Sequence, residues 1–323
     1  MKMAVLDDYQ DSVKHLACFA LLKDHQVVVF NDTFNEDELV AKLIDVDILV
    51  LIRERTPITE TLLSRLPNLK LISQTGKVSN HLDPALCHQY GVEVAEGVGS
   101  PVAPAELCWA LIMAASRRIP TYVSQLQQGV WQSSKELGLG RVLNGKMLGI
   151  WGYGKIGQRI AQFGKVFGMQ VMVWGSESSR QKALDDGLLA AQTKAEFFQT
   201  ADIVSLHLRL HDATKHCVTK ADLARMKSDA LFVNISRAEL VESGALYDVL
   251  STTPTKQAAL DVYEQEPANK NNEPLLTLPN VLCSPHLGYV EQNSYELYFN
   301  AAFDNAVAFA AGKPQQLVRR AMG

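Results

Sequence analysis

Three charged residues in the second half of the sequence each follow a largely apolar run. Arg237 follows ALFVNIS, Glu266 follows AALDVYEQ and His286 follows NVLCSP. Reducing a ketone by hydride requires a proton donor beside the carbonyl, a group that keeps this donor protonated, and a cation for a carboxylate or developing alkoxide. Histidine titrates near neutrality, a nearby carboxylate favours its charged form, and a guanidinium is a permanently charged, forked donor. Each residue alone also fits a purely structural role, so the prediction of an acid/base site depends on the three together.

A glycine-rich segment, MLGIWGYGKIG, supplies a second site. Its glycines have the G-x-G-x-x-G spacing, directly after an apolar run and directly before the helical pattern QRIAQFGKVFG. Such glycines let the chain turn sharply and approach a pyrophosphate, whose charge then lies at the helix N-terminus. The next apolar run, QVMVWG, follows at the distance that a βαβ unit requires. The segment therefore predicts a dinucleotide site formed by Gly152, Tyr153, Gly154, Lys155, Ile156 and Gly157.

The segment that would meet the ribose leaves the choice between NAD and NADP open. The apolar run after the glycine loop ends at Gly175. Glu177 can reach the ribose hydroxyls, whereas Ser176, Ser179 and Arg180 can form a pocket for a 2′-phosphate. A solvated loop with mixed charges fits the same residues equally well.

The elements that position these residues alternate along the chain. Four short runs rich in Val, Ile and Leu precede residue 75, and six follow residue 146. Continuous runs of this kind predict strands buried on both faces of parallel sheets, which indicates a doubly wound α/β fold. Residues 104–131 predict a long helix, interrupted by Pro120, and a second segment that link two domains. Residues 294–312 predict a helix that returns to the first domain.

Length and composition favour an ordinary globular protein of about two domains. The chain has 323 residues, 47% of them hydrophobic, and a net charge of −4. This charge excludes the basic footprint of a nucleic-acid-binding protein. The five cysteines are odd in number and scattered, as in proteins of the reducing cytoplasm. No apolar run reaches the roughly 18 residues that a membrane span needs, so we expect a cytoplasmic protein.

Four ordered motifs carry a resemblance to a known family. The segments GYGKIG, NISRAEL, ALDVYEQEP and SPHLGY resemble those of the D-isomer-specific 2-hydroxyacid dehydrogenases, including phosphoglycerate dehydrogenase-like members. Elsewhere LKLISQTGKVSNHLD is similar to the family's substrate loop, and PVAPAELCWALIMAASRRIP to its interdomain and dimer helix. The resemblance implies a short form without a regulatory domain and a homodimer.

The resemblance also implies the architecture and the activity. We expect a flavodoxin-like substrate domain formed by residues 1–100 plus 290–323, a Rossmann cofactor domain formed by residues 101–289, and an active-site cleft between them. The expected activity is NAD(P)-dependent interconversion of small 2-oxo and 2-hydroxy acids. An NADH-sensing corepressor-like protein without physiological turnover is the alternative. Formate dehydrogenase fits less well, because that branch has glutamine at the position of Glu266.

Site residues follow from the resemblance by position. His286 is the expected acid/base, Glu266 its carboxylate partner, and Arg237 the cation that binds and polarises the substrate. On the cofactor side, Asp261 is expected to bond the nicotinamide carboxamide, and further expected contacts come from His207, Arg209 and Ile235. The expected substrate contacts are Arg53 and the backbone of Gly76, Lys77 and Val78. No metal site is predicted, because His286 has no second ligand at a recognisable spacing.

Several positions depart from the family's pattern. Gly175 stands where NAD-specific members have aspartate, and Val78 stands where a second glycine is usual. Arg209 stands at a common proline, and Ala238 replaces a glycine. Glu54 replaces a small polar residue, and its charge is expected to repel a phosphorylated substrate.

Overall fold

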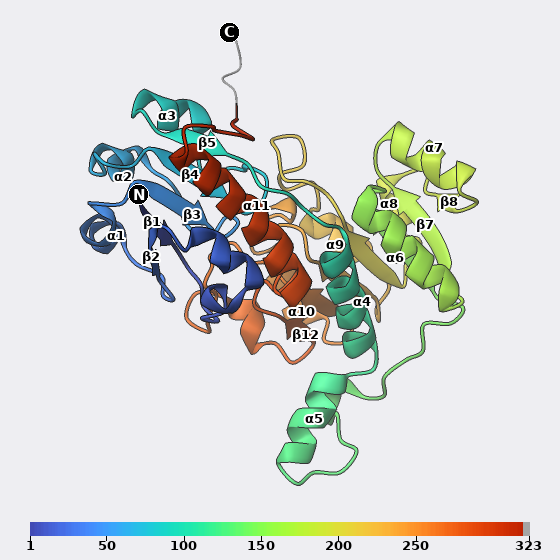
Figure 1. Ribbon diagram of the computed structural model, residues 1–323. Coiled ribbons are helices and arrows are strands. Elements are labelled where there is room, and N and C mark those ends of the chain that lie inside the picture. The colour runs from blue at the N-terminus through green and yellow to red at the C-terminus, as the bar shows by residue number, and fades with distance from the viewer. Residues whose placement is uncertain (319–323) are drawn as a thin grey trace. The chain divides into compact units, whose positions relative to one another are not determined.

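The computed structural model describes residues 1–318, which divide into two compact units (Figure 1). The first unit contains Met1–Ser100 together with the chain from Glu291 onward, and the second is Pro101–Val290. Each unit is built on its own parallel sheet with helices on the faces. The predicted α/β class with two doubly wound parallel sheets is therefore confirmed.

The sheet of the first unit has five parallel strands in the order β2-β1-β3-β4-β5. These strands are β1 (Lys2–Val5), β2 (Gln26–Val29), β3 (Ile48–Leu51), β4 (Leu71–Gln74) and β5 (Glu93–Ala95). All residues of β3 and β4 are buried. Central strands of a parallel sheet are covered on both faces, which explains why β3 is an unbroken run of Ile, Leu and Val rather than an alternating pattern.

The helices of the first unit begin at polar caps. They are α1 (Glu36–Leu43), α2 (Glu60–Ser64), α3 (Pro84–Gln89) and α11 (Gln292–Ala310), with two short 3₁₀ turns, η1 (Val13–His15) and η2 (Ala17–Leu22). Asn35 and Glu38 form a reciprocal capping box at the start of α1. The C-terminal helix α11 packs on β3 and β4, where the Ser73 hydroxyl donates to the Ala302 carbonyl at 2.8 Å. The predicted return of the chain to the first unit is thus observed.

The sheet of the second unit has seven parallel strands in the order β12-β11-β10-β9-β6-β7-β8. They are β6 (Met147–Trp151), β7 (Gln170–Trp174), β8 (Leu189–Ala190), β9 (Ile203–Leu206), β10 (Leu231–Asn234), β11 (Gln257–Leu260) and β12 (Val281–Cys283). The chain runs outward from β6 to β8 and then crosses to β9 on the other side of β6. Ligands of open α/β sheets bind outside the carboxyl ends of the strands at such a reversal.

The second unit contains several α-helices, of which α5 projects away from the sheet and the others flank it (Figure 1). They are α4 (Val102–Ser116), α5 (Ile119–Gln127), α6 (Lys155–Val166), α7 (Glu177–Asp185), α8 (Lys194–Thr200), α9 (Lys220–Arg225) and α10 (Ala245–Thr252), with 3₁₀ turns η3 (Lys135–Leu137), η4 (Ala238–Leu240) and η5 (Pro274–Thr277). The break between α4 and α5 falls at Arg118, which has a left-handed φ of 55°. Pro120 lies in the first turn of α5, where a missing N–H costs nothing. The predicted long helix and second segment are therefore both present, and the break between them falls two residues before Pro120.

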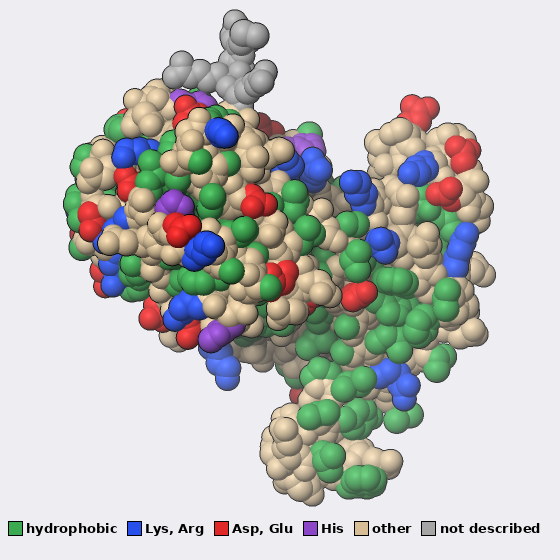
Figure 2. Space-filling model, viewed as in Figure 1, with side chains coloured by type: hydrophobic (Ala, Val, Ile, Leu, Met, Phe, Trp, Pro, Cys, Tyr) green, Lys and Arg blue, Asp and Glu red, His purple; other side chains and the backbone are tan. Residues whose placement is uncertain are grey.

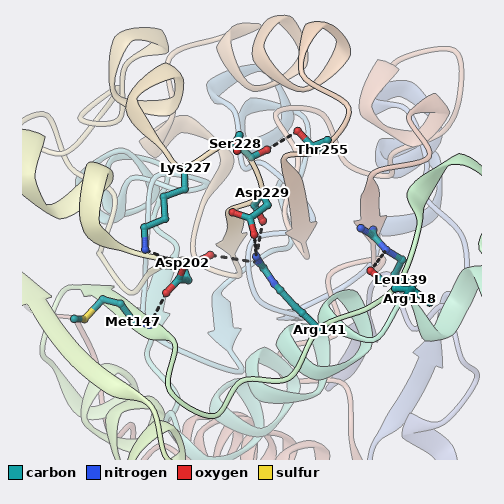
Figure 3. A network of polar contacts seen from close by, with 9 residues as sticks. All are labelled: Arg118, Leu139, Arg141, Met147, Asp202, Lys227, Ser228, Asp229 and Thr255. Atoms are coloured by element: carbon teal, nitrogen blue, oxygen red, sulfur yellow. Dashed lines mark hydrogen bonds and ion pairs between the residues drawn. The ribbon is translucent and has the colours of Figure 1, made fainter.

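A polar network fixes the chain that returns from α5 to the sheet (Figure 3). Arg141 donates to the Asp229 carbonyl at 2.5 Å. The buried carboxylate of Asp202 accepts from the Met147 N–H at 2.7 Å and from the Lys227 ammonium at 2.9 Å. These contacts join the starts of β6, β9 and β10, so they hold the amino-terminal edge of the sheet together.

All ten predicted strands are present, but two strands were missed. They are β5, with three residues, and β8, with two residues at the sheet edge. Runs this short carry no usable periodicity. In the range 1–318, none of the helices combines the length and apolar character needed to cross a membrane.

Candidate active site

His286 and Glu266 lie in the loops that follow β12 and β11. The Nδ1 atom of His286 is 2.7 Å from Oε2 of Glu266. The other carboxylate oxygen accepts from the Tyr263 N–H at 3.0 Å, so the carboxylate is oriented from both sides. The side chains of His286 and Glu266 are 26% and 34% exposed, which leaves both within reach of a small molecule.

The backbone of His286 has an unusual conformation that Asp261 supports. His286 has a φ of 52°, in the left-handed region that non-glycine residues seldom adopt. Asp261 is fully buried, and its Oδ1 accepts from the Ser284 hydroxyl at 2.5 Å and the Leu287 N–H at 2.8 Å. Its Oδ2 accepts from the Gly288 N–H at 2.9 Å. The Asp261 carboxylate thus clamps the loop on both sides of the histidine.

Burial raises the pKa of Asp261 above its ordinary value, although the hydrogen bonds from Ser284 and Leu287 and the nearby His286 oppose the shift. Both of its oxygens are engaged by the histidine loop. The expected bond from Asp261 to the nicotinamide carboxamide stays a prediction.

Arg237 follows β10, which is the neighbour of β11 in the sheet. The Asn234 amide donates to the Arg237 carbonyl at 2.8 Å, and the guanidinium donates to the Ser236 carbonyl at 2.5 Å. The three predicted catalytic residues therefore follow three adjacent strands, β10, β11 and β12. The sequence analysis selected these residues because residues that follow parallel strands are expected to meet at one edge of the sheet.

The glycine loop has the geometry of a dinucleotide cradle. A β-carbon on Gly152, whose φ is +101°, would lie 2.4 Å from the His207 carbonyl, and one on Gly157 would lie 2.1 Å from the Gly152 carbonyl. Gly154 instead faces open space and begins α6 without a side-chain cap. The N–H groups of the first turn of α6 therefore have no side-chain acceptor and can donate to an anion, so the loop fits a pyrophosphate.

Other residues of the loop support this arrangement. The hydroxyl of Tyr153 donates to Asp186 at 2.9 Å, and the Tyr153 carbonyl accepts from the Gln158 amide at 3.0 Å. Lys155 is exposed in the first turn of α6, and Ile156 is half-buried behind it. The loop is thus held from its outer side, with a positive charge near the helix N-terminus.

No carboxylate ends β7. Gly175 follows this strand with a φ of +151°, and Ser176 caps α7 by accepting from the Ser179 N–H at 3.3 Å. Glu177 is exposed in the first helical turn. The Arg180 guanidinium lies 5.1 Å from the centre of the Trp174 ring. The hydroxyls of Ser176, Ser178 and Ser179 are gathered here, whereas Glu177 is exposed.

His207 lies beside the glycine loop and is neutral. Burial of its ring lowers the pKa to about 3. Its Nε2 lies 2.9 Å from the Ser205 hydroxyl. Nδ1 is buried and has no protein partner in the part of the chain that the structure describes. The two other expected cofactor contacts differ in exposure, since Arg209 is exposed and Ile235 is buried after β10.

In the first unit, the structure brings Arg53 and Gly76 together. A β-carbon on Gly76 would lie 1.9 Å from Nη1 of Arg53. Arg53 has a φ of 55°, its N–H donates to the Thr75 hydroxyl at 3.1 Å, and its carbonyl accepts from the Gln74 amide at 2.6 Å. Two of the predicted substrate residues, far apart in sequence, therefore form one cluster.

The other two predicted substrate residues contact a residue that the sequence analysis missed. The Val78 N–H donates to Oε1 of Glu96 at 2.9 Å, and the Lys77 ammonium lies 2.8 Å from Oε2. Glu96 directly follows β5. The strand-end rule would have marked it, had this short strand been predicted.

Comparisons with known proteins agree with this geometry. The sequence profile described as "D-isomer specific 2-hydroxyacid dehydrogenase, NAD binding domain" matches residues 109–288. A glyoxylate reductase of Aeropyrum pernix is 36% identical over 267 residues, which cover 80% of this chain and 79% of the relative. A D-3-phosphoglycerate dehydrogenase of Methanocaldococcus jannaschii is 32% identical over 89% of this chain, but the match spans only 53% of that longer protein.

A solved structure is similar over its full length. It is the crystal structure of a phosphoglycerate oxidoreductase from Vibrio cholerae O395, with 67% sequence identity and a TM-score of 0.96. The superposition covers 97% of this chain and 99% of that one.

The fold, the glycine cradle and these matches define an NAD(P)-dependent oxidoreductase that acts on CH–OH groups. The chain belongs to the D-isomer-specific 2-hydroxyacid dehydrogenase family. Among residues 1–318, no three His, Cys, Asp or Glu side chains are grouped so that they could hold a metal ion.

Proposed function

We propose that this protein reduces small 2-oxo acids, and oxidises the corresponding D-2-hydroxy acids, with His286 as the acid/base. The contact that carries the proposal is the 2.7 Å distance between Nδ1 of His286 and Oε2 of Glu266. With Nδ1 donating to the carboxylate, Nε2 is the ring nitrogen available to exchange a proton with the substrate oxygen.

The proposed roles divide among the chain's own residues. A bound nicotinamide supplies or accepts the hydride at C2 of the substrate. His286 gives the proton to the forming hydroxyl during reduction, and Glu266 orients the ring through its contact with Nδ1. Arg237 binds the carboxylate and polarises the carbonyl, since its guanidinium keeps its charge and offers a forked donor. Arg53 and the loop from Gly76 to Val78 supply the first unit's contacts with the substrate.

We infer the substrate class from the names of two relatives and from the negative charge of Glu54. Two relatives are named for glyoxylate and for 3-phosphoglycerate. Glyoxylate is a 2-oxo acid and 3-phosphoglycerate is a 2-hydroxy acid, so both compounds belong to the proposed substrate class. Glu54 follows Arg53 directly, and its negative charge disfavours a phosphate group at that place. We therefore expect glyoxylate and hydroxypyruvate to be better substrates than phosphorylated acids.

The deciding experiment follows oxidation of NADH and NADPH in parallel against glyoxylate, hydroxypyruvate, pyruvate and bulkier 2-oxo acids. Replacing His286 by alanine should lower kcat by about 10²–10⁴. Glu266→Gln should lower it by a smaller factor, on the order of 10 to 100, because one charged hydrogen bond is weakened. Near-normal turnover in His286→Ala would refute the assignment.

The same assay tests the alternative function. Binding of NADH without turnover on any 2-oxo acid, together with NADH-dependent retention of a protein partner, would indicate the sensing protein instead.

We further propose a cytoplasmic homodimer. The five cysteines are all free thiols, as expected in a reducing compartment. Seven large apolar residues are exposed within the arm, defined as residues 119–142: Ile119, Val123, Leu126, Val130, Trp131, Leu139 and Val142. Figure 2 shows hydrophobic side chains gathered over α5. Exposed apolar residues at this density favour binding of a protein partner, and we propose that a second copy of the chain covers them.

A further inference from the structure

Glu96 holds the loop that was expected to receive the substrate carboxylate. We infer that Glu96 is a positioning residue for this loop, residues 75–80, and that it thereby sets the affinity for the 2-oxo acid. The inference rests on the proposed function, because it concerns the same substrate.

The Glu96 carboxylate contacts two successive residues of the loop. Oε1 accepts from the Val78 N–H at 2.9 Å, and Oε2 pairs with the Lys77 ammonium at 2.8 Å. The Lys77 side chain is 67% exposed, so this ion pair is strongly screened by solvent. The Val78 bond, made by a main-chain donor to a charged acceptor, is therefore the stronger of the two contacts between Glu96 and the loop.

Glu96 is itself held by its backbone. Its N–H donates to the Gln316 carbonyl at 3.0 Å, and its carbonyl accepts from the Asn305 amide at 3.0 Å. The Gly97 N–H donates to the Gly76 carbonyl at 2.9 Å. Helix α11 and the chain that follows it thus fix the main chain of Glu96, from which the carboxylate extends to the loop.

This arrangement separates the backbone donors of the loop into two groups. The Val78 N–H is used by Glu96. The N–H groups of Gly76 and Lys77 have no hydrogen-bond partner within residues 1–318. The Arg53 guanidinium lies against Gly76. With Glu96 in place, the N–H groups of Gly76 and Lys77 lie beside the Arg53 guanidinium. Hydrogen-bond donors of this kind bind a carboxylate.

The test compares Glu96→Ala with Glu96→Gln and with Asp45→Ala. Glutamine keeps an oxygen that accepts from Val78, whereas alanine removes it. Asp45→Ala is the matched control, since it deletes the carboxylate of another exposed ion pair, with Lys2, in the same unit. The quantities measured are kcat, KM for the active 2-oxo acid, the Kd for NADPH, and the Kd of oxamate for the enzyme with bound cofactor.

Glu96→Ala should raise KM and the oxamate Kd about tenfold, the effect of losing one hydrogen bond to a charged group, with the NADPH Kd unchanged. Glu96→Gln should stay within about threefold of the wild type, because the Val78 bond is retained. Asp45→Ala should match the wild type. If Glu96→Ala does not fold, Glu96→Ser replaces it, since the hydroxyl is too short to reach Val78.

A wild-type KM and oxamate Kd in Glu96→Ala would overturn the inference. Equal increases in the Ala and Gln variants would overturn it as well, because the Val78 bond would then not be the cause. No turnover by the wild-type protein on any 2-oxo acid would instead refute the proposed function.

Discussion

Gly76 and Arg53 are in such close contact that no side chain fits between them. A β-carbon at position 76 would lie 1.9 Å from Nη1 and 2.9 Å from Cζ of the guanidinium. A side chain at position 76 would therefore have to displace the flexible end of Arg53, and no unusual backbone angle is involved. The contact links the loop after β4 to the residue that follows β3 by two positions, at adjacent strands of the first sheet.

Replacing Gly76 by alanine should displace the Arg53 guanidinium. We expect KM for the 2-oxo acid to rise by about tenfold or more, because a charged hydrogen bond to the substrate is lost, while NADPH binding is kept. Steady-state kinetics and cofactor fluorescence measure the two effects. Gly99→Ala is the control, since a β-carbon there meets nothing within 4 Å. A wild-type KM in Gly76→Ala would exclude a substrate role for this contact.

Replacing Asp261 by asparagine should disturb the loop that carries His286. One oxygen becomes an NH₂ group and faces backbone N–H donors, so at least one bond to Leu287 or Gly288 is lost. We expect kcat to fall by at least about tenfold, because the left-handed backbone of His286 loses support and the imidazole is no longer held in place. Ser284→Ala removes only the hydroxyl bond to Asp261 and should have a smaller effect. Turnover equal to the wild type in Asp261→Asn would show that the clamp does not position the histidine.

The residues after β7 lead us to expect a preference for NADPH. Removing the guanidinium in Arg180→Ala should raise KM for NADPH about tenfold or more and leave KM for NADH nearly unchanged, because only NADPH has the 2′-phosphate. Glu177→Gln is the reciprocal variant. If it raises KM for NADH and Arg180→Ala changes neither value, the ribose is held by the carboxylate and the preference is for NADH.

His207 should make stability depend on pH. Its pKa is about 3 in the folded protein, because burial opposes protonation, and near 6.5 when unfolded. Below pH 6.5 the unfolded chain therefore gains a proton that the folded protein does not, and the free energy of unfolding falls by up to about 1.4 kcal/mol per pH unit. Above pH 6.5 the residue has no effect.

Urea unfolding of wild-type protein and His207→Gln between pH 7.5 and 4.5 measures this contribution. The variant should show a flatter decline of the unfolding free energy with falling pH. His211→Gln, at an exposed histidine, serves as the control and should follow the wild type. Parallel curves for His207→Gln and the wild type would mean that His207 is protonated in the folded state.

The apolar arm should control assembly. Trp131 and Leu139 are 75% and 89% exposed, and a charge at either position should weaken an interface that buries them. We expect the wild type to sediment as a dimer, and Trp131→Glu and Leu139→Glu to sediment as monomers at the same concentration. Val166→Glu is the control, since Val166 is 84% exposed at the end of α6, outside the arm. A dimer in all three variants would place the interface elsewhere.

The sequence by itself determined the elements with strong local signals. Long apolar runs predict buried parallel strands, because only strands covered on both faces are apolar throughout. The spacing of Gly152, Gly154 and Gly157 predicts a phosphate cradle, because such glycines let the chain turn sharply and let its backbone approach a pyrophosphate. Arg237, Glu266 and His286 could be selected together because each follows a predicted strand, and the carboxyl ends of parallel strands meet at one edge of a sheet.

Only the tertiary structure decided the contacts that depend on residues distant in the chain. Asp261 lies far enough from His286 in sequence that no spacing rule links its carboxylate to the histidine loop. Glu96 follows a strand too short to be predicted, and its hold on Val78 exists because α11 and the chain after it fix the Glu96 backbone. Arg53 meets Gly76 only because β3 and β4 pair in register. Local patterns record which elements form, whereas side-chain partners across loops are set by how those elements pack.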